Sequence, residues 1–492
     1  MARTYLSTDD PIVALATPPG TGALAIIRCS GRDAIERCAK CFSRPSALRA
    51  ASGYQMVHGF VLDPETKDRI DEVMAAVYRA PHSFTGEDSV ELSCHGSPAI
   101  AMRIEEALQK AGFVPALRGE FTFRAFLHGK ADLVQAEAID ELVRSPADSA
   151  REAALARLGG ELSARFASIR NEMLDILAEC EAMLDYPEDE GVEQSSIWAA
   201  RLRALQGELA TLADTYRAGR LREEGALVVV AGRPNAGKSS LFNSLVREER
   251  AIVSPEPGTT RDWLESWLEI EGYAVRLVDT AGLRQGKSEM EEEGVRRARE
   301  LVERADVVVY LVDGVEGLNE EDGIFLAHEP GAIRVWNKID KPDCKLVPEA
   351  WLGVSAKKAV NLGVLRNEIV SRLQAQSGLD RAYGKTSKVP QSKLPRTRPM
   401  GTEAHESQLL GPGTRHAGTE AEVLIASKRQ KDLVDACLRS VAEAIAGIEA
   451  GFPLDAISVS LHEAADALGQ ITGEIGGEEV FERIFGSFCL GK

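Results

Sequence analysis

Gly232–Ser240 reads GRPNAGKSS in this 492-residue chain, and this stretch determines which fold we expect around it. It follows the apolar run Ala226–Ala231 and precedes a helical pattern, which is the strand–loop–helix setting of a phosphate-binding loop. Its glycines let backbone N–H groups turn towards phosphates, and Lys238 adds a positive charge for the β and γ phosphates. The Ser239 hydroxyl can bind Mg²⁺. We therefore predict a nucleotide-binding α/β domain.

Two further segments fit the contacts that a nucleotide and its Mg²⁺ ion need. The motif DTAG, Asp279–Gly282, follows an apolar run, where a carboxylate at a strand end can hold the hydration shell of the ion. GTTRD, Gly258–Asp262, lies between the phosphate loop and DTAG, where a switch segment places a threonine hydroxyl on the ion. By its position, that threonine is Thr260.

The motif NKID, Asn337–Asp340, predicts that the base is guanine. The Asp340 carboxylate can accept hydrogen bonds from guanine N1–H and N2–H₂, and adenine offers neither donor. The motif SAK, Ser355–Lys357, fits a further backbone contact to the guanine oxygen. GRPNAGKSS, DTAG, NKID and SAK follow one another in this order, which is hard to explain as an accident, so we expect GTP as the ligand.

The residue after DTAG is Leu283, whereas small GTPases use a glutamine there to orient the attacking water. Hydrolysis must therefore be assisted in another way, either by an arginine from a partner or by a bound monovalent cation. Asn235 offers a neutral oxygen ligand inside the phosphate loop and suits the cation. The acidic cluster Glu289–Glu293 could supply a carboxylate for the water, or it could be a solvated face near a helix start.

Composition and charge limit the other classes of function. The chain is 44% hydrophobic and 27% charged, and its length suggests about three domains. No apolar run reaches the roughly 18 residues that cross a bilayer, and the eight cysteines are scattered, so we expect a cytoplasmic protein without a membrane partner. The net charge of −18 argues against coating nucleic acid through bulk electrostatics, because phosphate contacts need Lys and Arg.

Hydrophobic periodicity divides the chain into segments. Up to residue 124, short β-like runs alternate with turns, which predicts a small α+β domain. Helical spacing marks residues 125–222 and returns in 421–492, whereas residues 223–379 carry the apolar runs of a mostly parallel sheet with covering helices. We therefore predict an α/β domain inserted into a helical bundle. Residues 380–420 are polar and rich in proline and glycine, which predicts a mobile linker.

Taken together, the motifs resemble the tRNA modification GTPase family known as MnmE or TrmE. GRPNAGKSS, GTTRD, DTAGLR and NKID are shared with many GTPases. The C-terminal FCLGK, Phe488–Lys492, and the N-terminal elements TPPG, SFTGED, HG and GEFTFRAFLHGK are more specific. The resemblance covers nearly the whole chain. It implies an N-terminal tetrahydrofolate-binding domain that dimerises and a Ras-like P-loop G domain inserted in the helical domain.

The resemblance also implies an activity and partners. Family members dimerise their G domains across K⁺ and GTP, which stimulates hydrolysis. With an FAD-dependent partner, MnmG, they place a carboxymethylaminomethyl group on C5 of the wobble uridine of certain tRNAs. The one-carbon donor is 5-formyltetrahydrofolate or a related tetrahydrofolate, and the FAD belongs to the partner. For this chain we expect a homodimer and a heterotetramer with MnmG.

Carried over by motif, the resemblance assigns residues to the nucleotide and its ions. K⁺ falls to Asn235, Ser254, Glu256 and Thr259, and Mg²⁺ to Ser239 and Thr260. Glu291 would orient the attacking water, and Lys238 would stabilise the phosphate charge. The complete GTP-binding set consists of Asn235, Ala236, Gly237, Lys238, Ser239, Ser240, Ser254, Pro255, Glu256, Pro257, Gly258, Thr259, Thr260, Asp279, Thr280, Ala281, Gly282, Asn337, Lys338, Asp340, Ser355, Ala356 and Lys357.

For the folate, the resemblance points to Arg28, Glu91, Lys130 and Lys492. Cationic groups suit the carboxylates of a glutamate tail, and a glutamate suits the N–H donors of a pterin. Cys489 would face the folate and take part in the modification chemistry. The alternative for Cys489 is a buried thiol packed against Phe488.

Two rival functions remain. A ribosome-assembly GTPase would act as an RNA-binding switch without modification activity. It predicts a KH-like or basic RNA module, and the sequence has no GxxG loop in a basic helical context. A folate-binding scaffold with a degenerate GTPase is the second rival, and the intact Lys238, Asp279 and Asp340 argue against it.

Overall fold

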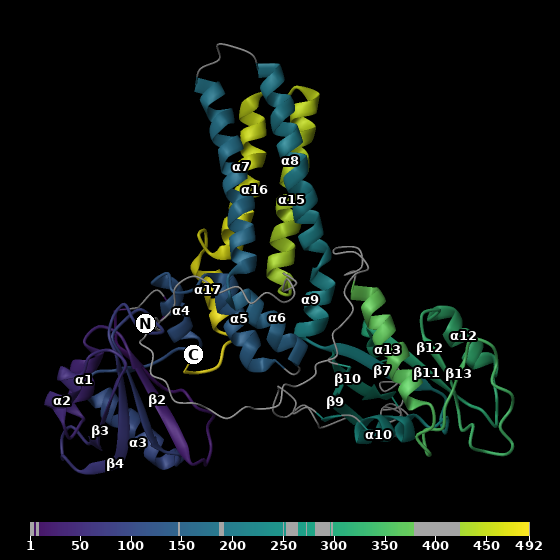
Figure 1. Ribbon diagram of the computed structural model, residues 1–492, viewed down its shortest axis with the longest axis horizontal. Coiled ribbons are helices and arrows are strands. Elements are labelled where there is room, and N and C mark those ends of the chain that lie inside the picture. The colour runs from purple at the N-terminus through teal and green to yellow at the C-terminus, as the bar shows by residue number, and fades with distance from the viewer. Residues whose placement is uncertain are drawn as a thin grey trace, which may run out of the picture. The chain divides into compact units, whose positions relative to one another are not determined.

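The computed structural model describes residues 4–5, 9–145, 148–185, 191–248, 250–251, 264–271, 273–280, 296, 299–377 and 424–491 (Figure 1). The chain divides into two compact units. The first unit contains Met1–Ser145, Ala150–Leu209 and Lys428–Lys492, and the second contains Pro146–Ser149 and Ala210–Ser427. The second unit therefore interrupts the first in the sequence, as an inserted domain does.

A six-stranded sheet forms the N-terminal part of the first unit, in the order β3-β4-β5-β2-β1-β6. The strands are β1 (Ile12–Leu15), β2 (Leu24–Ser30), β3 (Gln55–Leu62), β4 (Arg69–Tyr78), β5 (Ser89–His95) and β6 (Val114–Pro115). The helices are α1 (Ala34–Lys40), α2 (Pro45–Ala50) and α3 (Pro98–Lys110). Side chains alternate between the faces of a strand, so Ala25, Ile27 and Cys29 of β2 enter the core and Arg28 lies on the opposite face.

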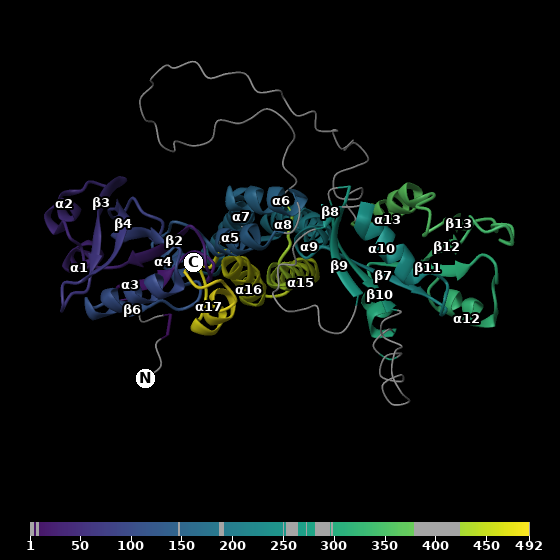
Figure 2. The same cartoon turned by 90° about the horizontal axis from the view of Figure 1, so that it is seen from below.

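An aromatic cluster joins the start of the helical region to the end of the chain. It packs α4 (Glu120–Leu127) against α17 (Glu478–Phe485) through Phe123 and Phe485, whose ring centroids are 5.2 Å apart. Tyr5 packs edge-on against Phe123 and donates a hydrogen bond to the Arg118 carbonyl at 2.6 Å. The turned view in Figure 2 shows α17 beside α4. The C-terminal segment is thereby brought to the N-terminal sheet.

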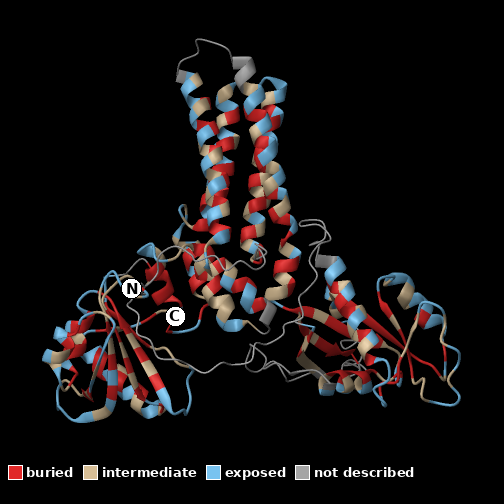
Figure 3. Cartoon of the chain, in the orientation of Figure 1, coloured by how far each residue is buried: buried red, intermediate tan, exposed pale blue. Residues whose placement is uncertain are grey.

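Long helices make up the rest of the first unit, and the second half of the bundle comes from the C-terminal part of the chain. They are α5 (Leu133–Arg144), α6 (Asp148–Leu158), α7 (Glu161–Asp185), α8 (Gly191–Asp214), α15 (Lys428–Ala450) and α16 (Leu454–Thr472). Phe166, Ile169, Met173 and Ile176 recur at helical spacing along α7 and are buried. Figure 3 shows buried residues along the helices of this bundle. Among the residues that the structure describes, no helix is long and apolar enough to cross a bilayer.

The second unit is built on a seven-stranded sheet in the order β13-β12-β11-β7-β10-β9-β8. Its strands are β7 (Ala226–Gly232), β8 (Arg250–Ala251), β9 (Leu264–Ile270), β10 (Tyr273–Asp279), β11 (Val307–Asp313), β12 (Ile333–Asn337) and β13 (Leu352–Gly353). Its helices include α9 (Tyr216–Glu223), α10 (Lys238–Glu248), α12 (Glu320–His328) and α13 (Leu362–Ser377). Strands β13, β12, β11, β7 and β10 are parallel, and every residue of β11 is buried.

The predicted fold class is confirmed: an α+β domain, a helical bundle and an inserted, mostly parallel α/β domain. The carboxyl ends of parallel strands meet at one edge of a sheet, where open α/β folds bind ligands. Here β7, β10 and β12 end at Gly232, Asp279 and Asn337, which are the first residues of the three predicted motifs.

Candidate nucleotide-binding site

The phosphate loop curls around its own lysine. Gly232, Asn235 and Gly237 have positive φ angles of 140°, 63° and 99°, which lets the chain turn tightly between β7 and α10. Lys238 is the first residue of α10, and its ammonium donates to the carbonyl oxygens of Gly232 and Arg233, both at 2.8 Å. The positive charge is therefore held inside the loop that would surround the phosphates.

The predicted magnesium ligands lie together at the ends of β7 and β10. The Ser239 hydroxyl donates to Asp279 Oδ2 at 2.6 Å, and Asp279 is fully buried. Parallel pairing of the strands sets Asp279 beside Val230, whose carbonyl accepts a hydrogen bond from the Thr280 hydroxyl at 3.0 Å. A hydroxyl and a carboxylate oxygen side by side are the ligand types that Mg²⁺ prefers.

Asn337 joins the phosphate loop to the two loops predicted for the base. Its side-chain amide donates to the Ala236 carbonyl at 2.8 Å, and its Oδ1 accepts from the Ala356 N–H at 3.0 Å. A Cβ atom on Gly237 would lie 2.2 Å from Asn337 Nδ2, so only glycine allows this approach. The loops that begin at Gly232, Asn337 and Ser355 therefore form one bonded surface.

Asp340 is oriented by Ser355. The Ser355 hydroxyl donates to Asp340 Oδ1 at 2.6 Å, and this hydrogen bond is the main cause of the lowered pKa of Asp340. Ser355 is itself fully buried, which fixes the direction from which it holds the carboxylate. The arrangement presents a charged acceptor with one oxygen already positioned, as recognition of the guanine N–H groups requires.

Lys338 of NKID is held by a residue that the sequence analysis did not single out. Its ammonium lies 2.6 Å from Asp313 Oδ2, at the end of β11. Burial alone would raise the pKa of Asp313, but the hydrogen bonds from Lys338 and from the Val315 N–H outweigh it and lower that pKa. Asp313 ends the apolar run VVVYLV as Asp279 ends YAVRLV, and this parallel could have identified it.

The structure gathers a large part of the predicted GTP-binding set at one edge of the sheet. These residues are Asn235, Ala236, Gly237, Lys238, Ser239, Ser240, Asp279, Thr280, Asn337, Lys338, Asp340, Ser355, Ala356 and Lys357. Other predicted residues lie outside the described residues: Ser254, Pro255, Glu256, Pro257, Gly258, Thr259, Thr260, Ala281, Gly282, Leu283 and Glu291. The predicted linker, residues 380–420, lies outside them as well.

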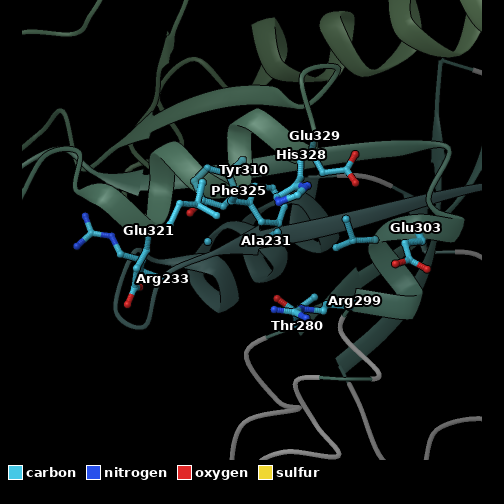
Figure 4. A pocket seen from close by; sticks show the side chains of 13 residues that line it. Ala231, Arg233, Thr280, Arg299, Glu303, Tyr310, Glu321, Phe325, His328 and Glu329 are labelled. Carbon is cyan, nitrogen blue, oxygen red and sulfur yellow. The ribbon is translucent and has the colours of Figure 1, made fainter.

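A cavity of about 610 Å³ lies next to the phosphate loop (Figure 4). Arg233, Thr280, Arg299, Tyr310 and Phe325 are among its lining residues. Gly232 and Arg233 of the phosphate loop and Thr280 of DTAG belong to this lining, whereas no residue of NKID or SAK does, so the cavity adjoins one side of the phosphate loop.

The predicted folate residues Arg28 and Glu91 form an ion pair. They stand directly opposite each other on β2 and β5, and Arg28 Nε donates to Glu91 Oε1 at 2.8 Å. The Tyr78 hydroxyl donates to the other carboxylate oxygen at 3.3 Å. The ring of Phe84, which is partly exposed, lies 5.4 Å from the Arg28 guanidinium carbon. Tyr78 and Phe84 were not predicted, because the sequence shows neither the strand register that brings Tyr78 to Glu91 nor the path of the SFTGED loop that carries Phe84.

The C-terminal segment reaches this ion pair. Arg28 Nη1 donates to the Gly491 carbonyl at 3.4 Å, and Gly491 has a φ of 86°. A Cβ atom on Gly491 would lie 2.4 Å from the Leu15 carbonyl oxygen. Cys489 is exposed while Phe488 is buried, so the alternative of a buried Cys489 thiol is wrong. The turn at Gly491 allows the chain to pass close to β1.

Lys130, another predicted folate residue, lies near the SFTGED loop. A Cβ atom on Gly86 would lie 3.6 Å from Lys130 Cε and 2.8 Å from His128 Cβ. The last predicted folate residue, Lys492, lies outside the described residues. The structure thus brings Arg28, Glu91 and the C-terminal segment together and sets Lys130 beside the loop that carries Phe84.

A buried charge cluster supports this region and connects two of the N-terminal motifs. Arg124, from GEFTFRAFLHGK, is fully buried and donates to the Glu87 carboxylate of SFTGED at 3.1 and 3.2 Å. It also donates to Glu120 at 2.9 Å and to the Asp10 carbonyl at 2.7 Å. A buried guanidinium is stable only when it is paired in this way. The cluster therefore fixes the SFTGED loop above the sheet.

Comparisons with known proteins agree over both units. Family models described as "MnmE helical domain" and "GTP-binding protein TrmE N-terminus" match residues 133–489 and 11–130. The tRNA modification GTPase MnmE of Treponema denticola is 38% identical, over 99% of this chain and 99% of that protein. The MnmE of Thermus thermophilus is 40% identical, over 99% of this chain and 100% of that protein. Among solved structures, Aquifex aeolicus Era is 28% identical and covers 30% of this chain and 56% of its own, with a TM-score of 0.24.

Proposed function

Because the chain belongs to the MnmE family of tRNA modification GTPases, we propose that it hydrolyses GTP and thereby drives modification of the wobble uridine of tRNA. The observation that carries the GTPase part is the joined surface at the ends of β7, β10 and β12, in which Asn337 bonds both the phosphate loop and the loop after β13. The G domain is assigned to residues 223–379 and the folate-binding domain to residues 1–124.

Guanine selection is assigned to Asp340. Its carboxylate accepts two N–H donors of guanine, while adenine would leave it unpaired. The bond from Ser355 holds one oxygen in place, so less ordering is needed when the base binds. The remaining residues of the predicted GTP-binding set belong to the phosphate loop, the switch segments and the base-recognition loops. They are assigned to the nucleotide on the basis of the family resemblance.

Mg²⁺ is assigned to Ser239 and Thr260, with Asp279 acting through water. The close pair of Ser239 and Asp279 oxygens fits this ion. When bound, Mg²⁺ neutralises charge on the phosphates. Lys238, whose ammonium is held by the loop carbonyls, would turn to the phosphate oxygens from a position that is already buried.

K⁺ is assigned to Asn235, Ser254, Glu256 and Thr259, and the orientation of the attacking water to Glu291. The support is Leu283, which cannot orient water, together with the amide oxygen of Asn235 in the phosphate loop. GTP turnover measured in KCl and in NaCl tests this assignment. We expect much faster turnover in KCl. Equal rates in both salts would reject the cation in favour of an arginine from a partner.

A one-carbon folate, 5-formyltetrahydrofolate or a related compound, is assigned to Arg28, Glu91, Lys130 and Lys492. Each carboxylate oxygen has two lone pairs, so Glu91 can accept pterin N–H groups while it remains paired with Arg28 and Tyr78. The exposed Cys489 thiol lies on the segment that Arg28 contacts. Calorimetric titration of the full chain with 5-formyltetrahydrofolate tests the site, and Glu91→Gln should abolish the binding.

A homodimer is assigned on the basis of exposed apolar side chains on one face of the N-terminal sheet, and a location in the cytoplasm on the basis of the family's role in tRNA modification. Leu24, Met56 and Met74 are exposed on the face of the N-terminal sheet opposite to its core. Exposed apolar side chains gathered on one face are typical of protein interfaces. A heterotetramer with the FAD-dependent MnmG, in which the FAD stays on MnmG, would carry out the modification. Light scattering of the wild type and of Met56→Glu tests the dimer.

The alternative, a ribosome-assembly GTPase without modification activity, makes a different prediction in cells. Mass analysis of wobble uridines in cells that lack this chain should reveal the loss of the carboxymethylaminomethyl group. Unchanged wobble uridines combined with defective ribosomal subunits would favour the alternative.

A further inference from the structure

Arg233 belongs to the phosphate loop, but its side chain turns away from the loops that carry the nucleotide motifs. Its guanidinium contacts the segment that begins α12: Nε lies 3.1 Å from Asp322 Oδ1, Nη1 lies 3.3 Å from Glu316, and Nη2 donates to the Gly317 carbonyl at 2.5 Å. Arg233, Tyr310 and Phe325 are labelled at the cavity in Figure 4. The side chain therefore bonds the phosphate loop to α12.

Asp322 is the central residue of this contact. It is fully buried, and the same Oδ1 that pairs with Arg233 accepts a hydrogen bond from the Tyr310 hydroxyl at 2.8 Å. Its Oδ2 accepts from the Asn319 N–H at 2.9 Å and completes a capping box at the start of α12. A buried carboxylate is costly unless it is paired, so Arg233 and Asp322 depend on each other.

The backbone of Arg233 connects this contact to the phosphate site. Its carbonyl oxygen is one of the acceptors that hold the Lys238 ammonium. A side chain that is fixed at three points limits rotation of its own peptide unit, and therefore limits movement of that carbonyl. Asn235, with its positive φ, follows two residues later in the same turn.

The segment that receives Arg233 also touches the base-recognition loop. The Gly314 N–H donates to the Asn337 carbonyl at 2.9 Å, and Lys345 Nζ donates to the Glu316 carbonyl. Glu316 thus accepts from Arg233 through its carboxylate and from Lys345 through its backbone. One short segment, residues 313–322, therefore connects Arg233 of the phosphate loop to the NKID region.

We propose that Arg233, bonded to Asp322, is a positioning residue that holds the phosphate loop in the shape that binds the diphosphate group of the nucleotide. This proposal rests on the GTPase function proposed above. It predicts that losing the contact weakens nucleotide binding although Arg233 does not face the ligand. Removing a hydrogen-bonded charge of this kind typically changes an affinity about tenfold or more.

The test measures the Kd of the fluorescent nucleotide mant-GDP for the full chain. Arg233→Ala should raise the Kd about tenfold or more, and Arg233→Lys should fail to restore it because one ammonium cannot reach all three acceptors. Arg276→Ala is the matched control, since Arg276 lies on β10 and pairs with Glu265 at 3.6 Å, outside the phosphate loop. The control should bind like the wild type. A Kd for Arg233→Ala within about twofold of the wild type would overturn the proposal.

A double-mutant cycle separates positioning from general destabilisation. If Arg233 acts through Asp322, then Asp322→Asn should cause little further loss of affinity in the Arg233→Ala background. Independent, additive losses would overturn the proposal. If Asp322→Asn does not fold, Tyr310→Phe replaces it in the cycle, because it removes one hydrogen bond to Asp322 and keeps the ring stacked on Phe325. A wild-type chain that binds no mant-GDP would refute the GTPase function itself, which is a different outcome.

Discussion

Replacing Asp340 by asparagine should exchange guanine specificity for xanthine specificity. The Ser355 hydroxyl donates to Asp340 Oδ1 at 2.6 Å, so an asparagine at this position keeps its carbonyl oxygen towards Ser355 and turns its NH₂ group to the former place of Oδ2. Guanine presents donors at both N1 and N2, and one of them would then face a donor. Xanthine has a carbonyl oxygen at C2 instead and can accept from the new NH₂ group.

The magnitude follows from the one guanine donor that loses its charged acceptor and then faces another donor. The lost hydrogen bond is worth about 1.5–3 kcal/mol and the unpaired donor costs about 1–3 kcal/mol more, so the loss is about 2.5–6 kcal/mol. At about 1.4 kcal/mol for each factor of ten, GDP should bind roughly 100- to 10,000-fold more weakly. The backbone contacts around Asn337 are unchanged, so the variant should remain folded.

Competition of GDP and XDP against a fluorescent nucleotide measures this exchange. For Asp340→Asn, XDP should displace the probe at a lower concentration than GDP, and the wild type should have the opposite order. A variant that still prefers GDP would refute the placement of the base against Asp340. A variant that binds neither nucleotide but melts with the wild-type midpoint would refute the predicted NH₂ orientation.

Three further changes test other parts of the structure. Arg124→Met should lower the free energy of unfolding of the N-terminal region by about 3–5 kcal/mol, measured by hydrogen exchange, because it leaves the buried Glu120 carboxylate without its cation; unchanged exchange would contradict this. Burial raises the pKa of Tyr5 from 10.0 to about 12, so between these pH values the Tyr5 hydroxyl ionises in the unfolded chain but stays protonated in the folded protein. The free energy of unfolding should therefore fall as the pH rises through this range, and Tyr5→Phe should remove this decrease from a series of denaturation curves. Gly237→Ala should abolish mant-GDP binding, because its Cβ atom would lie 2.2 Å from Asn337 Nδ2, and normal binding would show that this contact is dispensable.

The nucleotide motifs were readable from the sequence because each one combines a strand end with a short loop. GRPNAGKSS and NKID each follow an apolar run directly, so local pattern alone places them at the carboxyl edge of a sheet. Their mutual contact was not readable in the same way. Asn337 and Ala236 are distant in the sequence, and no periodicity predicts that the amide of one bonds the carbonyl of the other.

Buried ion pairs were the features that could least be predicted from the sequence. Arg124 and Glu87 belong to two motifs that were quoted separately, and only the packing of α4 against the SFTGED loop reveals one cluster. Arg233 and Asp322 are likewise joined through tertiary structure. Charged residues are usually solvated, so a sequence gives no reason to expect one of them to be buried.

Strand register also changes how the predicted folate residues are understood. The family resemblance implied a cation for a glutamate tail and a carboxylate for a pterin, as two separate ligands. In the structure Arg28 and Glu91 face each other across β2 and β5, so the arginine also orients the glutamate. A shift of the register by one residue would turn Arg28 to the opposite face, which explains why this pairing requires the structure.

The paths into and out of the inserted domain explain how an α/β domain can interrupt a helical bundle. The Thr215 hydroxyl, just before α9, accepts a hydrogen bond from the Ile425 N–H at 3.1 Å. A Cβ atom on Gly219 would lie 2.1 Å from the Ile425 carbonyl oxygen, so the two chain segments touch through backbone atoms. An insertion whose ends lie side by side adds little constraint to the surrounding fold, because it replaces a short connection between neighbouring points.

Arg220 of α9 pairs with Asp306 at 2.5 Å, and Asp306 accepts a hydrogen bond from the Leu227 N–H at the start of β7. The entering helix is therefore fixed to the central sheet before the phosphate loop begins, which gives the nucleotide site a rigid base.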